Sequence, residues 1–273
     1  MNEEQLMVLA GLAPALILMV YIYIKDRHHP EPLSLWLKGI LFGVLSVVLA
    51  LAIEIAVRMW GWVPPHNTFF HAVQAAFVGA AFPEEVSKFF MLWLLLRKNK
   101  YFDERFDGIV YATCVGLGFA ATENVIYLFA NSANWQTVAV SRAMFSVPGH
   151  FFFAIAMGFF YSRAYFKERH LWNMALVILV PTMLHGIYDS LLYMVNINRF
   201  WTWVVLLLFW IFCICMLHAA RRRIAKQLAD DTKAPVLIPD APEWQDEIEA
   251  DEPETEGFIL EEESVEVASS EQN

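Results

Sequence analysis

The chain has 273 residues, of which 58% are hydrophobic and 15% aromatic, with a mean hydropathy of +0.44. Because soluble domains are about 45–50% apolar, this composition excludes an ordinary soluble globular protein and indicates one that crosses a membrane several times. The net charge of −10 is unevenly distributed, since sixteen Asp or Glu residues accompany the single Lys233 from Gln227 onward. We therefore expect a transmembrane domain over 1–226 and an acidic, disordered cytoplasmic tail over 227–273.

Seven stretches of the chain are long and apolar enough to form membrane-spanning helices, each of which needs about 20 residues. They cover approximately residues 5–24, 34–57, 68–96, 108–130, 138–162, 172–196 and 200–218. The connections between them are too short to hold a soluble domain. The sequence therefore predicts an all-α fold, a polytopic membrane helix bundle with about seven transmembrane helices.

Basic residues are concentrated at alternate connections, as expected when one side of the membrane is the cytoplasm. Only Arg58, Arg142 and Arg199 flank the other connections. This distribution predicts that the N-terminus lies outside the cell and the C-terminus in the cytoplasm. The fourteen residues on the expected cytoplasmic side are Lys25, Arg27, Lys38, Arg97, Lys98, Lys100, Arg105, Arg163, Lys167, Arg169, Arg221, Arg222, Arg223 and Lys226.

Polar residues within the third to sixth spans are the strongest functional signal, because a charge at membrane depth is costly and usually marks a function. Counted at about 1.5 Å per residue, these residues lie at a similar depth in four successive spans. We therefore expect them to form one polar layer. Its members are Glu84, Glu85 and Lys88 in the third span, Glu123 and Asn124 in the fourth, His150 in the fifth, and His185 and Asp189 in the sixth.

Helical spacing and charge indicate how this layer is organised. Residues four apart share a helix face, so Lys88 lies near Glu84 and also reaches Glu85. By the same rule, His185 lies near Asp189. One lysine cannot neutralise four carboxylates, so protons or a metal cation must supply the remaining positive charge. Such crowded carboxylates are suited to general acid or base catalysis.

Helix-breaking residues accompany the layer. Pro83, Pro148 and Pro181 shortly precede its members in three spans. Two glycines, Gly116 and Gly118, do so in the fourth span. Because backbone groups freed at membrane depth need protein or water as partners, these residues favour a hydrated cavity.

Several of the polar residues also have a purely structural interpretation. Near the end of the second span, Glu54 most simply forms an interfacial ion pair with Arg58. His150 by itself is typical of a structural hydrogen-bonding partner, and Glu123 with Asn124 is typical of contacts that join membrane helices. Their common depth on four spans favours a functional site instead.

Three sequence motifs resemble those of the PrsW-type intramembrane proteases. PEEVSK (83–88), DGIVYATCVGLGFAATEN (107–124) and HGIYD (185–189) are similar to the family motifs EExxK, FxxxEN and HxxxD, and an additional histidine, His150, lies on the intervening span. The family is related to the type II CAAX prenyl endopeptidases, whose second motif ends in His where this chain has Glu123. The resemblance covers Pro83 to Asp189.

This resemblance implies an endopeptidase, a protease of the hydrolase class, in the bacterial cytoplasmic membrane. Its partners are then the lipid bilayer and a membrane-anchored protein substrate, such as the anti-sigma factors associated with the family, and no nucleic acid is expected. The residues implied in catalysis are Glu84, Glu85, His150 and His185. Those implied to support them are Lys88, Glu123, Asn124 and Asp189.

Two mechanisms are compatible with these residues. In one, paired glutamates activate water without a metal: one glutamate deprotonates the water and the other accepts or delivers a proton. In the other, a metalloprotease mechanism, Zn²⁺ is bound by the candidate ligands Glu123, His150 and His185. The HExxH spacing of soluble metalloproteases does not occur in the sequence.

Two other function classes share some of these sequence features with a protease. A proton-coupled transporter also uses intramembrane acidic residues and histidines, but here they form a single layer with no trail of polar residues to both membrane faces. A catalytically silent membrane scaffold or regulator would not need both glutamates, both histidines and Asp189. The sequence therefore favours an intramembrane protease.

Overall fold

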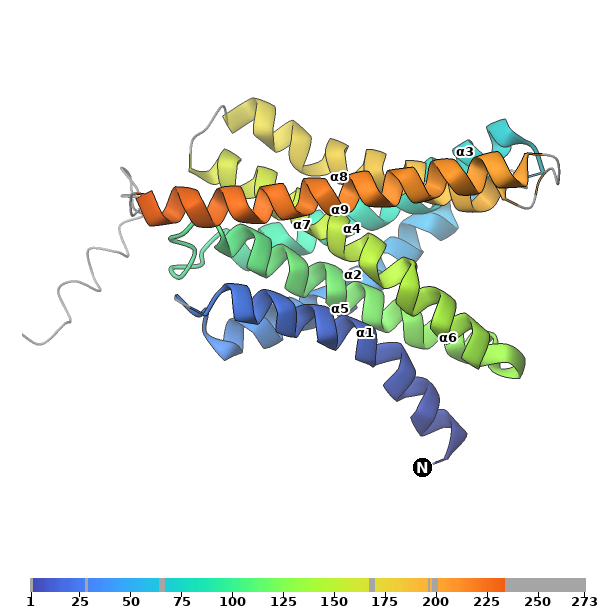
Figure 1. Cartoon of the computed structure of the whole chain (residues 1–273), viewed down its shortest axis with the longest axis horizontal. Coiled ribbons are helices and arrows are strands. Elements are labelled where there is room, and N and C mark those ends of the chain that lie inside the picture. Colours follow the sequence, from blue (N-terminus) through green and yellow to red (C-terminus); the bar gives the residue numbers. More distant parts are fainter. Residues whose placement is uncertain are drawn as a thin grey trace, which may run out of the picture. The chain divides into compact units, whose positions relative to one another are not determined.

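The computed structural model describes residues 2–27, 29–63, 67–166, 170–195, 197 and 201–233. Over these ranges the regular structure is entirely helical, with no strand, which confirms the predicted all-α class. The helices are α1 (Glu3–Lys25), α2 (Leu33–Met59), α3 (Phe69–Ala76), α4 (Phe82–Leu96), α5 (Asp107–Ala130), α6 (Trp135–Met144), α7 (Ser146–Tyr165), α8 (His170–Met194) and α9 (Thr202–Lys233) (Figure 1). A π-helical turn, Phe77–Ala81, joins α3 to α4, and a 3₁₀ turn, Ser132–Asn134, precedes α6.

Six helical segments in the described ranges are long and apolar enough to cross a membrane, which confirms a multi-pass membrane protein. They are Glu3–Lys25, Leu33–Met59, Asp107–Ala130, Ser132–Tyr165, His170–Met194 and Thr202–Thr232. The remaining predicted span, 68–96, is helical from Phe69 to Leu96 but consists of α3, the π-helical turn and α4 in succession. The predicted span 138–162 is also divided, because α6 ends at Met144 and α7 begins at Ser146.

Helix α5 lies at the centre of the bundle, where it packs against α1, α2, α6 and α7 (Figure 1). A Cβ atom on Gly118 would lie 2.5 Å from the carbonyl oxygen of Ile40 in α2. A Cβ atom on Gly116 would lie 2.7 Å from the Cβ atom of Ala154 in α7. These glycines therefore allow close packing between helices; the expectation that they break α5 is wrong.

The three prolines of the polar spans have different structural roles. Pro83 lies at the start of α4, directly after the π-helical turn, and Pro148 lies in the first turn of α7. Because first-turn N–H groups have no partner within a helix, Pro148 fits the start of α7. Pro83 instead lies within a continuous helical run, where its missing N–H accompanies the looser hydrogen bonding of the π-helical turn. Pro181 lies inside α8.

Helix α8 packs along α3, the π-helical turn and α4. A Cβ atom on Gly186 of α8 would lie 2.4 Å from the ring of Phe77 in this turn. Turns of this kind are rare and often occur at functional sites. The close contact brings His185 of α8 against the start of α4, which carries Glu84 and Glu85.

Helix α9 continues to Lys233, past the predicted end of the transmembrane domain at 226. The Asp231 carboxylate accepts hydrogen bonds from the backbone N–H groups of Arg105 and Phe106, both at 2.9 Å, and Gln227 is buried. The first residues assigned to the tail thus belong to the folded part, because they hold the α4–α5 connection. The rest of the predicted tail, 234–273, and three of the basic residues used for topology lie outside the described residues: Lys167, Arg169 and Arg199.

Candidate active site

Lys88 of α4 joins three of the predicted site residues. Its Nζ atom donates hydrogen bonds to Glu84 Oε2 at 3.1 Å and to Glu85 Oε1 at 2.8 Å. It also donates to His150 Nδ1 of α7 at 3.1 Å, and it lies 4.0 Å from the ring centroid of Phe119. All of these side chains are buried. The helical spacing of α4 therefore produces the expected Lys–Glu contacts, and α7 adds a histidine to them.

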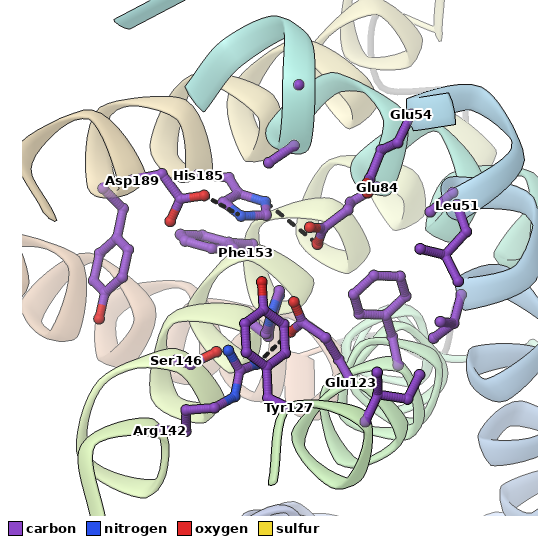
Figure 2. A pocket seen from close by; sticks show the side chains of 18 of the residues that line it. Leu51, Glu54, Glu84, Glu123, Tyr127, Arg142, Ser146, Phe153, His185 and Asp189 are labelled. Atoms are coloured by element: carbon purple, nitrogen blue, oxygen red, sulfur yellow. Dashed lines mark hydrogen bonds and ion pairs between the residues drawn. The ribbon is translucent and has the colours of Figure 1, made fainter. Parts of the chain in front are cut away.

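His185 of α8 lies between carboxylates from two helices. Its Nδ1 atom is 2.9 Å from Glu85 Oε1, and its Nε2 atom is 3.4 Å from Asp189 Oδ2, one turn further along α8. The imidazole ring stacks on Phe153 with ring centroids 4.7 Å apart. Figure 2 shows the ring between Asp189 and Glu84, whose Oε2 atom is 4.0 Å from Nδ1. These contacts fix the orientation of the imidazole relative to α4.

The partners of the two histidines determine where their protons lie. His150 Nδ1 faces the Lys88 ammonium group, which only donates, so the ring proton is on Nε2. That proton is donated to Glu123 Oε2 at 3.0 Å. Both ring nitrogens of His185 face carboxylate oxygens, and the imidazolium form satisfies both. This arrangement therefore favours a neutral His150 and a cationic His185.

Glu123 and Asn124 of α5 both bind Arg142 of α6. Arg142 Nη2 donates to Glu123 Oε2 at 2.5 Å, and Arg142 Nε donates to Asn124 Oδ1 at 2.7 Å. The Asn124 Nδ2 atom donates to the carbonyl oxygen of Gly11 in α1 at 3.2 Å. Asn124 thus joins α1, α5 and α6, while Glu123 connects Arg142 to His150.

Arg142 is a site residue that was not predicted from the sequence, because it belongs to the three basic residues expected to flank the connections on the outer side of the membrane. Its position inside the predicted span 138–162 is the signal that identifies it, since arginine is costly at that depth. Its guanidinium carbon lies 4.0 Å from the ring centroid of Tyr127. Figure 2 shows Arg142, Tyr127 and Glu123 grouped on one side of the pocket, across from His185.

Part of the cluster lines a cavity of 320 Å³ between α2, α4, α5, α6, α7 and α8. Glu84 is on its wall, whereas the described lining includes neither Glu85 nor Lys88. Glu54 and Arg58, expected to form an interfacial pair, also line it. Because a water molecule occupies about 30 Å³ in the liquid, the cavity has room for several. The other cluster members on the wall are Glu123, Arg142, His150, His185 and Asp189.

The charges of the described cluster are only partly balanced. Its permanent cations are Lys88 and Arg142, and a cationic His185 adds a third positive charge. One carboxylate therefore still lacks a compensating charge, which a proton or a metal cation must supply. The four carboxylates of the cluster are Glu84, Glu85, Glu123 and Asp189.

The donor atoms of four residues are close enough to share a metal ion. One ligand atom from each of Glu84, Glu85, His150 and His185 lies within 4.8 Å of the others. Each imidazole directs Nδ1 toward this group and Nε2 toward a carboxylate outside it, and metal-binding histidines are typically held this way. Among the described residues, Glu85 Oε2 is buried and has no hydrogen-bond partner.

These residues offer the nitrogen and oxygen ligands that a zinc ion accepts, provided that His185 releases its Nδ1 proton when the metal binds. The set differs from the expected one, because Glu123 is a partner of His150 Nε2 and does not belong to the group of four. The Lys88 ammonium group contacts three of the four members.

Comparisons with known proteins cover the whole of this cluster. The model of a family described as "PrsW family intramembrane metalloprotease" matches residues 31–217. A "Protease PrsW" from Geobacillus kaustophilus (strain HTA426) is 40% identical over 187 residues, which are 67% of this chain and 78% of that protein. Proteins of the same name from Clostridioides difficile (strain 630) and Bacillus subtilis (strain 168) are each 34% identical over 67% of this chain, covering 78% and 81% of their own lengths. No solved structure matches the chain.

Proposed function

This chain belongs to the PrsW family of intramembrane metalloproteases, and from that premise we propose that Glu84 and Glu85 activate water to hydrolyse peptide bonds of membrane-anchored proteins. Family membership makes the chain a peptidase, and its helices make it a multi-pass protein of the bacterial cell membrane. The observation that carries the proposal is the position of Glu84. Its carboxylate is on the wall of the cavity and within reach of both Lys88 and His185.

We assign different roles to the two glutamates because their surroundings differ. Glu84 is next to the space that water can occupy, so it acts as the base that removes a proton from the attacking water. Glu85 is 0% exposed and lies between Lys88 and His185. It therefore orients these two side chains. The proton that Glu84 removes from water passes to the leaving amine nitrogen as the peptide C–N bond breaks, and Glu85 accepts or delivers a proton through His185 during this transfer.

His185, Lys88 and Arg142 provide the positive side of the site. A cationic His185 on the cavity wall, whose two N–H groups face Glu85 and Asp189, places its positive charge near the oxygen of the scissile carbonyl as negative charge develops there. Lys88 holds the carboxylates of Glu84 and Glu85 together. Arg142, which also lines the cavity, binds Glu123 and so fixes the partner of His150.

If the family's metal is bound, Glu84, Glu85, His150 and His185 are the residues that would hold it. It would supply a Lewis acid that polarises the carbonyl and increases the acidity of water. In that case Asp189 and Glu123 orient the two imidazoles through their Nε2 atoms. The neutral form of His150 already leaves Nδ1 as an acceptor or ligand.

The substrate we propose is a membrane-anchored protein, and regulators of the anti-sigma-factor type are the candidates that the family suggests. A peptide bond within a helix is shielded by its own backbone hydrogen bonds, so the cleaved segment has to be extended when it enters the cavity. We also propose, from the distribution of basic residues, that the N-terminus is outside and the C-terminus in the cytoplasm.

The proposal is tested with a membrane-tethered reporter that releases a soluble fragment when it is cut. We expect Glu84→Gln, Glu85→Gln and His185→Ala each to lower fragment release by about 10²-fold or more, with normal amounts of inserted protein. Glu4→Gln is the matched control, because Glu4 is an exposed glutamate in the first turn of α1. Undiminished release by all three variants would reject the assignment in favour of a scaffold or a transporter.

A further inference from the structure

A second group of carboxylates lies outside the apolar spans, where the α1–α2 and α4–α5 connections meet. Glu31 belongs to the first connection, Asp103 to the second, and Asp107 is the first residue of α5. One oxygen atom from each lies within 4.8 Å of the others. The three residues line a hollow of 320 Å³ together with His29 and Glu104. Four carboxylates and one imidazole thus face the same space.

One oxygen atom of the buried Asp107 carboxylate has no hydrogen-bond partner among the described residues. The side chain is 1% exposed, and its Oδ2 atom accepts a hydrogen bond from the backbone N–H of Glu104 at 2.7 Å. The atom without a partner in the described part of the chain is Oδ1. An unpartnered buried carboxylate oxygen is costly. The nearest members of the group, Glu31 and Asp103, are themselves acidic and cannot supply positive charge.

The surrounding contacts pre-arrange the group. The backbone N–H of Glu31 donates to Asp26 Oδ2 at 3.2 Å, and the Tyr111 hydroxyl donates to Glu31 Oε2. Asp231 of α9 accepts two backbone hydrogen bonds from the α4–α5 connection. The fold therefore holds Glu31 and Asp107 in place, and Asp103 is exposed on the same α4–α5 connection.

We propose that Glu31, Asp103 and Asp107 bind a hard divalent cation, Mg²⁺ or Ca²⁺, that joins the α1–α2 connection to the start of α5. The donors are exclusively oxygen atoms of carboxylates, which Mg²⁺ and Ca²⁺ prefer and which distinguish this site from the imidazole-containing cluster in the membrane. The cation supplies the charge that the group lacks and occupies the direction left open at Asp107 Oδ1. The site is independent of the proposed hydrolytic function.

A shared proton is the competing explanation for the same geometry. Burial raises the pKa of Glu31 to about 7, so near neutral pH a proton on Glu31 would relieve part of the crowding. At a fixed pH of 8, a cation site gives a saturable response to added Ca²⁺ or Mg²⁺, whereas a group that only shares a proton gives none. The two explanations therefore separate at pH 8.

The test uses the full chain purified in detergent, freed of divalent ions with a chelator, and titrated at pH 8 with Ca²⁺ or Mg²⁺ in separate samples. We expect saturable binding, and a rise in Tm of about 5–10 °C at a hundred-fold excess over Kd. Because Asp103 is exposed, Asp103→Asn is expected to leave folding intact and to abolish the rise in Tm. Glu104→Gln removes one negative charge from the neighbouring residue, which lies outside the group of three, and is expected to keep the rise in Tm.

Three results would overturn the proposal. The first is no binding and no change in Tm with either cation. In that case, a Tm that increases when the pH is lowered from 8 to 6 assigns the group to a shared proton. The second is an undiminished rise in Asp103→Asn. The third is an equal loss in Glu104→Gln, which indicates screening of surface charge.

Discussion

The two carboxylate clusters of this chain differ in how their charge is balanced. In the membrane cluster, Lys88 and Arg142 are fixed cations within hydrogen-bond distance of the carboxylates they neutralise. In the loop cluster, Glu31, Asp103 and Asp107 are all acidic. Within a bilayer a buried charge is costly unless a group of opposite charge lies next to it, and most of the positive groups here are part of the chain. At the end of the bundle, ions from solution take this role.

The donor types of the two clusters lead to different chemistry. Imidazole nitrogens next to carboxylates both transfer protons and bind zinc-like metals, which suits hydrolysis. A group of carboxylates alone has no such intermediate acid or base, and it suits a structural cation. If this comparison is correct, substitutions in the membrane cluster lower stability or activity more than substitution of Asp231, which holds the connection that carries part of the loop cluster.

Lys88→Met is expected to have the largest effect on stability. It removes the ammonium group that donates to both Glu84 and Glu85 and leaves only His185 beside these buried carboxylates, which lowers the free energy of unfolding by about 3–5 kcal/mol. Unfolding of the purified protein in detergent measures the change. Lys38→Met, at an exposed lysine on α2, is the control and is expected to change stability by less than about 0.5 kcal/mol. Equal stability of the two variants would show that the buried charges are not balanced by Lys88.

Arg142→Gln tests the cation that the sequence did not single out. Loss of the charged hydrogen bonds to Glu123 and Asn124 is expected to lower the free energy of unfolding by about 1.5–3 kcal/mol. Arg58→Gln serves as the comparison, because Arg58 lines the same cavity but is exposed. A similar loss in both variants would mean that Arg142 acts through the cavity's overall charge rather than through these contacts.

Asp189→Asn separates orientation from stability. Asp189 contacts Nε2 of His185, and removal of such an outer carboxylate typically lowers activity about 10–100-fold. We expect this loss in the rate of reporter cleavage at saturating substrate, with an unchanged Tm. A variant that cleaves normally would show that His185 does not depend on this partner.

Asp231→Asn tests the contacts that hold the α4–α5 connection beside the loop cluster, and it is expected to have the smallest effect. The change weakens two hydrogen bonds to backbone N–H groups and lowers the free energy of unfolding by about 1 kcal/mol. Asp230→Asn is the matched control on the same helix. A loss as large as that of Lys88→Met would contradict the distinction between the two clusters.

Contacts within one helix were predictable from the sequence, because helical geometry determines them. The pairs of Lys88 with Glu84 and Glu85, and of His185 with Asp189, follow from spacings of three and four. The apolar spans likewise follow from composition. These local rules were sufficient to identify the four spans that carry the cluster.

Contacts between helices were less predictable, because they depend on how closely the helices approach. In the sequence Gly118 suggests a helix break, but in the fold its lack of a side chain allows α2 to pack closely against α5. Arg142 reads as a residue near a connection, but the break between α6 and α7 places its guanidinium group beside Glu123. Similarly, nothing in the local sequence of Asp107 links it to Glu31 in another connection.

The central claim is that Glu84 removes the proton from water, and one measurement tests it most directly. The turnover rate of Glu84→Gln on a tethered substrate is compared with that of Glu54→Gln, both purified and reconstituted in lipid vesicles. Both residues line the cavity, but only Glu84 belongs to the group around Lys88. We predict a rate about 10²–10⁴-fold lower for Glu84→Gln and a nearly normal rate for Glu54→Gln; equal rates would contradict the account.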